Sequence, residues 1–385
     1  MSRQKPPTTG PKDLLGRTLT RRELLRAGPA AAVIALGCDA GAPTLRPQTI
    51  STGKISGKIV GASHQTGHRL REGTFPRPKH TQEAKIVIVG GGIAGLSAGW
   101  KLSRSGVRDF VLLELEPTAG GNARWGENHV SAYPWGAHYL PVPTAESTAV
   151  HELLDEMGLI KGYGQDNKPI YDPRHLCHAP QERLFINGLW QEGLSARSLL
   201  PPDGTSMATE LTAFEAQIDW YRNYRDRHGR RAFALPVAAS TTDAEITALD
   251  QLSMAEYFDR AGWSSSRLRW YVDYCCRDDY GCTLDTTSAW AAWHYFCSRP
   301  EDVEYLTWPE GNGRIVRHLM GRLSPHVRSN MLVHRLGQNS DPSDTTARAV
   351  SVDAIDTNTE TAVRYRADHV IYALPRFTTR YLIKD

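Results

Sequence analysis

The sequence predicts an α/β fold, a Rossmann-like parallel sheet interrupted by an inserted α+β domain. Residues 85–89, Lys85 followed by four β-branched apolar residues, are typical of a strand buried on both faces of a parallel sheet. A glycine cluster, a helical stretch ending near Gly106 and a second apolar run at 110–113 follow directly. The middle of the chain, 144–304, mixes helical patterns with a hairpin pattern, so a second domain is expected there.

The composition is typical of a globular protein of more than one domain. The chain has 385 residues, 40% of them hydrophobic and 23% charged, with a formal net charge of +3. Basic and acidic residues are well mixed, and a basic stripe with interleaved aromatics is absent, so no nucleic-acid partner is predicted.

The six cysteines do not suggest a disulfide framework, because a chain of this length can bury a core without one. Buried free thiols are the favoured interpretation, and a bridge among Cys275, Cys276 and Cys282 stays open. His175, Cys177 and His178 are metal-ligand types, but no second cluster of matching spacing accompanies them, so no metal is predicted.

Residues 1–38 are expected to be an export leader and to take no part in the fold. Thr20–Leu25 forms a twin-arginine signature, followed by an apolar run at 30–36 that is too short to span a bilayer. Residues 35–38 resemble a lipobox, which would place a lipid on Cys38. The expected partners are therefore the twin-arginine export machinery and, through the lipid, a membrane, with a periplasmic location. A disordered basic arm is the alternative.

The export route favours a protein that carries a cofactor, because the twin-arginine system moves folded proteins and a cytosolic cofactor must be inserted before export. Residues 39–80 are rich in Gly, Pro, Thr and Ser without apolar periodicity, and they are predicted to be a linker.

The glycine cluster after the first strand fits the G-x-G-x-x-G pattern of dinucleotide-binding folds through Gly90, Gly92 and Gly95. Gly90 is expected to permit the tight turn, Gly92 to let a pyrophosphate approach the backbone, and Gly95 to allow close helix packing. A helix is predicted at 96–105, and the N–H groups and positive dipole end at its start suit a phosphate, so Ile93 and Ala94 just before it are expected to contact the cofactor.

Glu114 ends the second strand, where a carboxylate can accept the hydroxyl groups of a ribose. The same negative charge disfavours a 2′-phosphate and therefore NADP. The residues themselves leave FAD and NAD as alternatives.

The segment after Glu114 resembles the E-x5-G-G pattern of the flavin-dependent amine oxidase family, with Gly120 and Gly121 as the paired glycines. This family includes monoamine and polyamine oxidases, with phytoene desaturases as relatives. The resemblance implies FAD as the cofactor, with the paired glycines close to its flavin end. Asn122 stands where the family usually has an arginine, and the nearest arginine is Arg124.

Three further segments extend the resemblance. Residues 330–336 resemble a family segment whose valine backbone holds the adenine, which assigns that role to Val333, and 367–375 resemble the strand that re-enters the dinucleotide domain. The third segment, 135–139, resembles the family turn beside the flavin. This resemblance implies cofactor contacts for Gly136, Ala137 and His138, and substrate contacts for Trp135 and Tyr139, which flank them.

These matches set the expected domains. An FAD-binding domain is formed by 81–143 and 305–385, and the inserted substrate domain spans 144–304. Within the insert, the sequence predicts a hairpin at 183–190, a helix at 209–228, a capping box at Ser253–Glu256 and a helix that Asp285 caps. The family pattern continues beyond residue 385, so the FAD domain is expected to lack its C-terminal strand and the chain to be a fragment.

The leading functional hypothesis is an FAD-dependent oxidoreductase that transfers a hydride equivalent from a C–N or C–C bond of a small molecule to flavin N5. Trp135, His138 and Tyr139 are the candidates for an aromatic wall around the substrate, and no general base is identifiable. Two alternatives remain: an exported nucleotide-binding lipoprotein without turnover, and an NAD-dependent dehydrogenase.

Overall fold

The computed structural model describes residues 57–165, 168–178, 182–186, 188–194, 206–299, 304–338 and 349–383. The chain divides into two compact units, 1–58 and 59–385, and nearly all of the first lies outside the described residues. The twin-arginine segment and Cys38 are therefore outside them, as is Asn187 of the predicted hairpin turn.

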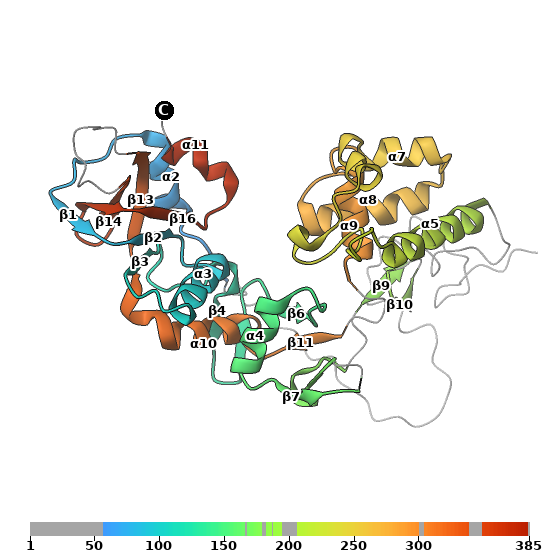
Figure 1. Ribbon diagram of the computed structural model, residues 1–385, viewed down its shortest axis with the longest axis horizontal. Helices are drawn as coiled ribbons and strands as arrows, with labels where there is room; N and C mark the ends of the chain where they lie inside the picture. Colours follow the sequence, from blue (N-terminus) through green and yellow to red (C-terminus); the bar gives the residue numbers. More distant parts are fainter. Residues whose placement is uncertain are drawn as a thin grey trace, which may run out of the picture. The chain divides into compact units, whose positions relative to one another are not determined.

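A parallel sheet forms the centre of the dinucleotide-type domain (Figure 1). Its strand order is β12-β3-β2-β16, and all three pairings are parallel. The strands are β2 (Ile86–Val89), β3 (Phe110–Leu113), β12 (Val327–Arg328) and β16 (His369–Tyr372). The predicted strands at 85–89 and 110–113 are confirmed. Strand β16, from the segment 367–375 that was expected to re-enter this domain, pairs with β2.

Residues of β2 and β3 alternate between two cores because neighbouring side chains of a strand point to opposite faces. Ile86, Ile88, Phe110 and Leu112 pack with α3 (Ile93–Arg104), α10 (Gly313–Leu323) and α4 (Thr148–Glu156). Their neighbours Val87, Val89, Val111 and Leu113 pack on a second sheet instead. This burial on both faces explains the unbroken apolar runs in the sequence.

The second sheet has the order β1-β15-β14-β13. It consists of β13 (Met331–Gln338), β14 (Val350–Asp356) and β15 (Thr361–Ala367), which pair antiparallel, and β1 (His80–Glu83), which is parallel to β15. Tyr365, Val352 and Val333 form the buried face that covers the parallel sheet. Helix α11 (Thr379–Leu382) contacts β13.

The linker prediction for 39–80 is wrong over its last part, where the structure has helix α2 (His64–Glu72). The helix is polar and contains Gly67, so its sequence has no apolar periodicity that would predict a helix. It ends at Gly73, which has a left-handed φ of 70°. Its Arg69 makes two hydrogen bonds of 2.9 and 2.7 Å with Glu360, and Leu70 packs on the second sheet.

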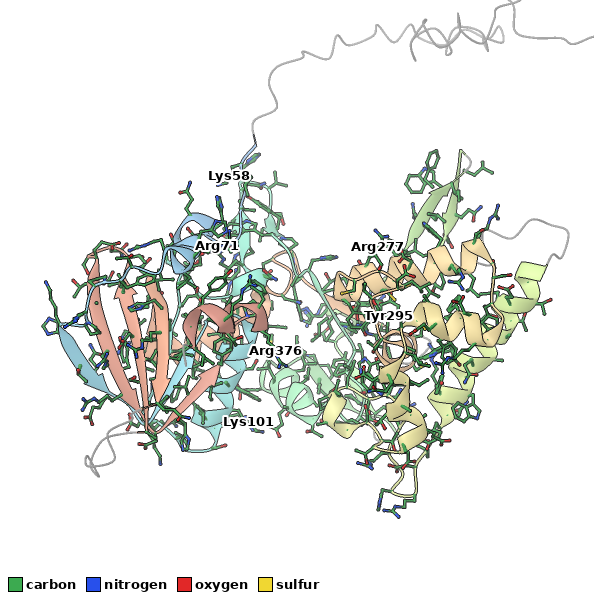
Figure 2. All side chains as sticks on the ribbon, turned by 90° about the horizontal axis from the view of Figure 1, so that it is seen from above. Lys58, Arg71, Lys101, Arg277, Tyr295 and Arg376 are labelled. Carbon is green, nitrogen blue, oxygen red and sulfur yellow. The ribbon has the colours of Figure 1, made fainter. Side chains whose placement is uncertain are left out.

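A helical core is built from 211–297. Its helices are α5 (Ser206–Asn223), α6 (Ala244–Thr247), α7 (Met254–Ala261), α8 (Ser266–Tyr280) and α9 (Ala289–Cys297). Trp293 of α9 is fully buried and stacks on Phe214. Figure 2 shows the side chains of these helices, with Arg277 of α8 and Tyr295 of α9 labelled.

The local predictions inside the insert have mixed outcomes. Ser253 and Glu256 form the predicted capping box, and the expected hairpin is present as β9 (Arg183–Ile186) and β10 (Leu189–Glu192). The helix expected at 209–228 ends at Asn223. Helix α9 is capped by Ser288 and not by Asp285, because the Ser288 hydroxyl accepts from the Ala291 amide.

The expected start of the insert at 144 also differs from the packing. Leu153, Leu154 and Tyr171 belong to the same core as β2 and β3, so α4 and the hairpin of β7 (Ile160–Tyr163) and β8 (Pro169–Tyr171) pack with the dinucleotide-type domain. The remaining strands are two short pairs, β4 (Trp125–Glu127) with β5 (Ala132–Pro134), and β6 (Tyr139–Pro141) with β11 (Tyr305–Thr307).

The part of the chain that the structure describes has no helix with both the length and the apolar character needed to cross a bilayer. Its five cysteines, Cys177, Cys275, Cys276, Cys282 and Cys297, are free thiols.

Candidate dinucleotide-binding site

The glycine turn between β2 and α3 has the geometry that its sequence pattern predicts. Gly90 has a φ of 102°, a left-handed conformation that side chains rarely adopt. A Cβ at Gly95 would lie 1.9 Å from the Gly90 carbonyl oxygen, so this glycine lets the first turn of α3 pack against the glycine turn. A Cβ at Gly92 would meet only the Gly121 Cα, at 3.9 Å.

Helix α3 begins at Ile93 without a side-chain cap on its N-cap residue, Gly92. The first N–H groups of a helix have no partner within the helix. Ile93 and Ala94 are exposed, so this helix end is open to a ligand, and its positive dipole end favours a phosphate.

Glu114 lies beside this turn and is buried. One carboxylate oxygen accepts a 2.6 Å hydrogen bond from the Gly91 amide, and the other accepts a 2.8 Å bond from the Glu116 amide. Burial raises the pKa of Glu114, and this effect exceeds the lowering by the two amide hydrogen bonds. A carboxylate has about four acceptor positions, so two remain for ribose hydroxyls.

The second glycine pair returns to the first. The Gly120 amide donates to the Gly91 carbonyl at 2.8 Å, and Gly92 and Gly120 form an isolated parallel bridge. Gly120 and Gly121 both have positive φ, 131° and 54°, and a Cβ at Gly121 would lie 3.1 Å from the Gly92 Cα. The two glycine segments thus form one backbone surface without side chains next to the start of α3.

Arg124 follows the glycine pair and is buried. Its guanidinium donates to Glu116 at 3.2 Å and to the Gly61 carbonyl, and it lies over the Trp135 ring with 5.3 Å to the ring centroid. Its Nε is buried and has no hydrogen-bond partner among the described residues. A buried donor of this kind needs an acceptor, so the site suits a ligand that supplies one.

The loop at 135–139 is joined to this surface by backbone hydrogen bonds. The Ala137 amide donates to the Asn122 carbonyl at 3.0 Å, and the Ala137 carbonyl accepts from the Asn312 amide at 3.0 Å. A Cβ at Gly136 would lie 2.9 Å from the Asn122 carbonyl oxygen, which explains the glycine. The His138 ring contacts the carbonyl of Gly136 at 3.0 Å.

The three aromatic side chains that were expected to form a substrate wall are exposed at the surface of the described structure. Trp135 is 36% and Tyr139 is 44% exposed, and His138 is exposed as well. Tyr139 makes edge contacts with the rings of His138 and Tyr305. They therefore line a surface on this loop, and their contact with a substrate stays a prediction.

Val333 belongs to β13, and the first residue of this strand is hydrogen-bonded to Glu114. The Met331 amide donates to the Glu114 carbonyl at 2.7 Å, which places the first residues of β13 at the end of β3. Val333 is buried in the core between the two sheets, and its contact with an adenine stays a prediction.

Glu116, which no sequence motif singled out, connects the site to the segment before α2. Its carboxylate accepts from the Ser63 amide at 2.6 Å as well as from Arg124. The only sequence signal was a second acid two residues after Glu114.

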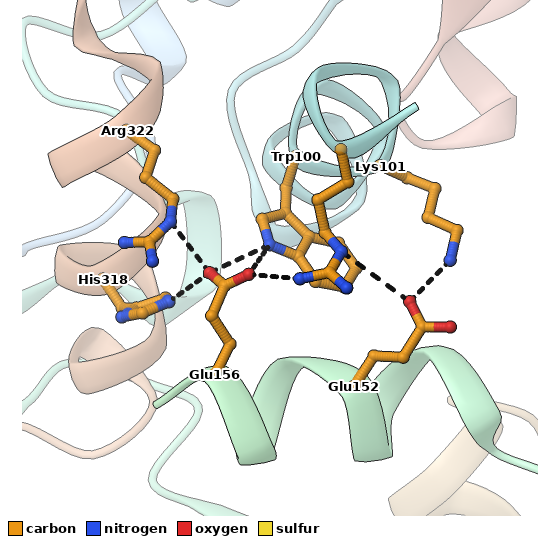
Figure 3. A network of polar contacts seen from close by, with 7 residues as sticks. Trp100, Lys101, Glu152, Glu156, His318 and Arg322 are labelled. Atoms are coloured by element: carbon orange, nitrogen blue, oxygen red, sulfur yellow. Dashed lines mark hydrogen bonds and ion pairs between the residues drawn. The ribbon is translucent and has the colours of Figure 1, made fainter. Parts of the chain in front are cut away.

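A polar network that no sequence motif predicts holds three helices of this domain together (Figure 3). The Glu156 carboxylate of α4 accepts from Arg104 at 2.7 Å, from His318 at 2.8 Å and from Trp100, and pairs with Arg322 at 2.8 Å. Burial would raise the pKa of Glu156, but the hydrogen bonds and the charge of Arg322 outweigh it, and the pKa is lowered.

The comparisons with known proteins agree with this geometry. Residues 88–157 match the family model of the NAD(P)-binding Rossmann-like domain. The chain is similar to the Baeyer-Villiger monooxygenase peniC of Penicillium patulum, with 34% identity over 87 residues, which are 23% of this chain and 12% of that protein. It is also similar to the ketocytochalasin monooxygenase of Aspergillus clavatus, with 30% identity over 150 residues, 38% of this chain and 19% of that protein.

A solved structure of putrescine oxidase bound to putrescine resembles the chain over most of its length. The TM-score is 0.51 at 15% identity, and the alignment covers 78% of this chain and 60% of that chain. This likeness concerns the fold, and it confirms the predicted α/β class with a Rossmann-like sheet. The chain thus spans only part of the length of each of these relatives.

Proposed function

We propose that the protein is an FAD-dependent oxidoreductase that acts on a C–N or C–C bond of a small molecule. The observation that carries the proposal is the joining of the two glycine segments, in which Gly120 bonds to Gly91 beside the buried carboxylate of Glu114. A side-chain-free surface that continues from the helix end towards Arg124 and Trp135 suits a dinucleotide with a large second ring system.

The residues divide the binding between them. The N-terminal turn of α3 would hold the pyrophosphate, Glu114 would accept from the ribose hydroxyls, and the unpartnered Nε of Arg124 would donate to a flavin or phosphate oxygen. When bound, the flavin supplies the hydride-accepting chemistry. The described residues offer no identified general base, so the chain's task in the reaction is to bind and orient cofactor and substrate.

An amine is the favoured substrate class. The fold resembles that of a solved structure of putrescine oxidase bound to putrescine, which is an amine. The exposed aromatic rings at 135–139 suit the hydrocarbon part of such a substrate. Fold alone does not select among amines, and a C–C bond stays the alternative.

Reconstitution tests the proposal. The purified chain is mixed with FAD, desalted and scanned for flavin absorption, and the bound flavin is then exposed to a panel of amines without oxygen. Retained flavin that is bleached by an amine is the expected result. Retained flavin that no donor bleaches would favour a nucleotide-binding protein without turnover. Binding of NAD but not FAD would favour a dehydrogenase.

We also propose that the protein is exported through the twin-arginine pathway and anchored at Cys38. The proposal rests on the arginine pair at 21–22, the short apolar run and the lipobox-like end of the leader. A folded protein that contains a cofactor suits this route.

A further inference from the structure

A cavity in the helical part of the chain lies outside the dinucleotide site. Its volume is about 400 Å³, and its lining comes from α5, α6 and α7 (α5 and α7 are labelled in Figure 1). The lining residues are Gln217, Trp220, Tyr221, Glu245, Ile246 and Tyr257. Three of the six are aromatic, and Glu245 is the only charged one.

The aromatic walls are held in place by the core beneath them. The rings of Tyr221 and Tyr257 lie 5.1 and 5.3 Å from the buried ring of Trp293. Trp220 meets Tyr221 edge-on at 5.0 Å and is 51% exposed. The cavity lining therefore includes two rings that pack on the buried Trp293 and one exposed ring.

Negative charge gathers at the same place. The Tyr224 hydroxyl lies within hydrogen-bond distance of two carboxylates, Asp243 at 2.5 Å and Glu245 at 2.8 Å. Hydrogen bonding to these carboxylates, Asp243 first, together with desolvation, raises the pKa of Tyr224. No lysine or arginine of the described residues forms an ion pair with either carboxylate.

The neighbouring arginines are engaged elsewhere. Arg230 pairs with Asp226 at 2.7 Å, Arg222 donates to the Phe296 carbonyl, and Arg225 donates to the carbonyls of Arg222 and Tyr224. Within the described residues, the carboxylate of Glu245 therefore lines the cavity without an ion-pair partner.

We propose that this cavity binds a small organic ammonium ion. Aromatic faces attract a cation through the ring quadrupole, and a carboxylate at the same site adds Coulomb attraction. Anions are disfavoured by the two carboxylates, and a bare metal ion by the aromatic lining, which offers few oxygen ligands. The site does not depend on FAD, so it can be tested whether or not the proposed reaction is correct.

The test compares choline with its neutral isostere 3,3-dimethylbutan-1-ol, which has the same shape without the charge. Binding to the full chain is followed by saturation transfer to the methyl protons and by calorimetry. Choline is expected to bind and the alcohol to bind roughly tenfold more weakly or not at all. Equal binding of both would overturn the proposal.

Two variants locate the binding, each with a matched control. Glu245→Gln and Trp220→Leu change side chains that are exposed, so the fold is expected to survive, which circular dichroism checks. Both should weaken choline binding roughly tenfold. Asp250→Asn and Trp270→Leu change an exposed carboxylate and an exposed tryptophan outside the lining and should leave it unchanged. Choline binding that survives in both lining variants would overturn the assignment.

Discussion

At the scale of single residues, Gly92 and Gly95 belong to one motif but meet different constraints. Gly95 is required by the fold, since its Cβ would overlap the Gly90 carbonyl. Gly92 has an extended backbone, with φ −71° and ψ −177°, that a β-branched residue also adopts, and it has room for a Cβ. The need for glycine at 92 therefore arises only with a ligand at the start of α3.

Gly92→Val should for this reason fold normally and lose FAD binding, because its methyl groups would occupy the path of the pyrophosphate. Flavin retained after desalting measures binding, and urea unfolding without cofactor measures stability. Gly321→Val is the control, since that glycine lies in α10 with open space around it. A Gly92→Val protein that purifies yellow would contradict the assignment.

Glu114→Ala should weaken FAD binding by about 1–3 kcal/mol, because it removes a buried acceptor. The substitution also leaves the Gly91 and Glu116 amides without their acceptor, so the unfolding free energy of the cofactor-free protein is measured alongside. Loss of stability without loss of FAD affinity would show that Glu114 serves only the fold.

The raised pKa of Glu114 gives a pH test with a definite sign. The folded protein holds this proton above the ordinary pKa of about 4.5, so the stability contribution is complete below that pH and is lost as the pH rises through the folded pKa. Glu114→Gln cannot lose a proton. Its stability relative to the unchanged protein, measured by urea unfolding without cofactor, should increase as the pH rises through this window. A difference that is constant with pH would contradict the raised pKa.

At the scale of elements, the carboxylate of Glu156 joins α4 to α3 and α10 (Figure 3). The Glu156 side chain is only 14% exposed, whereas Glu152, one turn earlier, is 39% exposed and binds Lys101 at 2.6 Å. Both carboxylates therefore pair with basic side chains, Glu156 in a mostly buried position and Glu152 in an exposed one.

Glu156→Gln should destabilise the protein by about 1–3 kcal/mol, since it leaves partly buried donors without an ionised acceptor. Glu152→Gln is the matched control and should have a much smaller effect, because exposed pairs contribute little. Because the folded pKa of Glu156 is lowered, its contribution is present above the ordinary carboxyl range and is lost as the pH falls through the folded pKa. Equal effects of both substitutions on the urea midpoint would contradict this interpretation.

At the scale of the whole molecule, the proposed export leader and the folded part can be tested separately. Replacing Arg21 and Arg22 with lysine should keep the protein in the cytoplasm, because the export machinery recognises the arginine pair. Fractionation of cells that express each form measures this. Cofactor binding by the purified protein should not change.

Cys38→Ala separates anchoring from export. If Cys38 carries a lipid, the variant should be exported but released from the membrane fraction, since each buried CH₂ of an acyl chain contributes about 0.8 kcal/mol to membrane binding. An unchanged membrane fraction would exclude the lipid anchor and leave the export proposal standing.

The sequence by itself determined the strand–glycine–helix–strand unit at 85–114, the acid at its end and the capping box at Ser253. Each depends on backbone sterics or hydrogen bonds between residues close in the chain, so a local pattern is enough to specify it. The same locality explains the error at Asp285, because Ser288 is an equally good cap three residues later.

Only the tertiary structure decided what distant segments do to one another. Helix α2 is held by Arg69 and Glu360, which are 291 residues apart, and the Glu156 network joins helices of three separate segments. The packing of α4 with the parallel sheet and the cavity beside Glu245 arise in the same way. Such contacts are stabilised by side-chain packing and desolvation between segments that are distant in the sequence, so a local sequence pattern does not predict them.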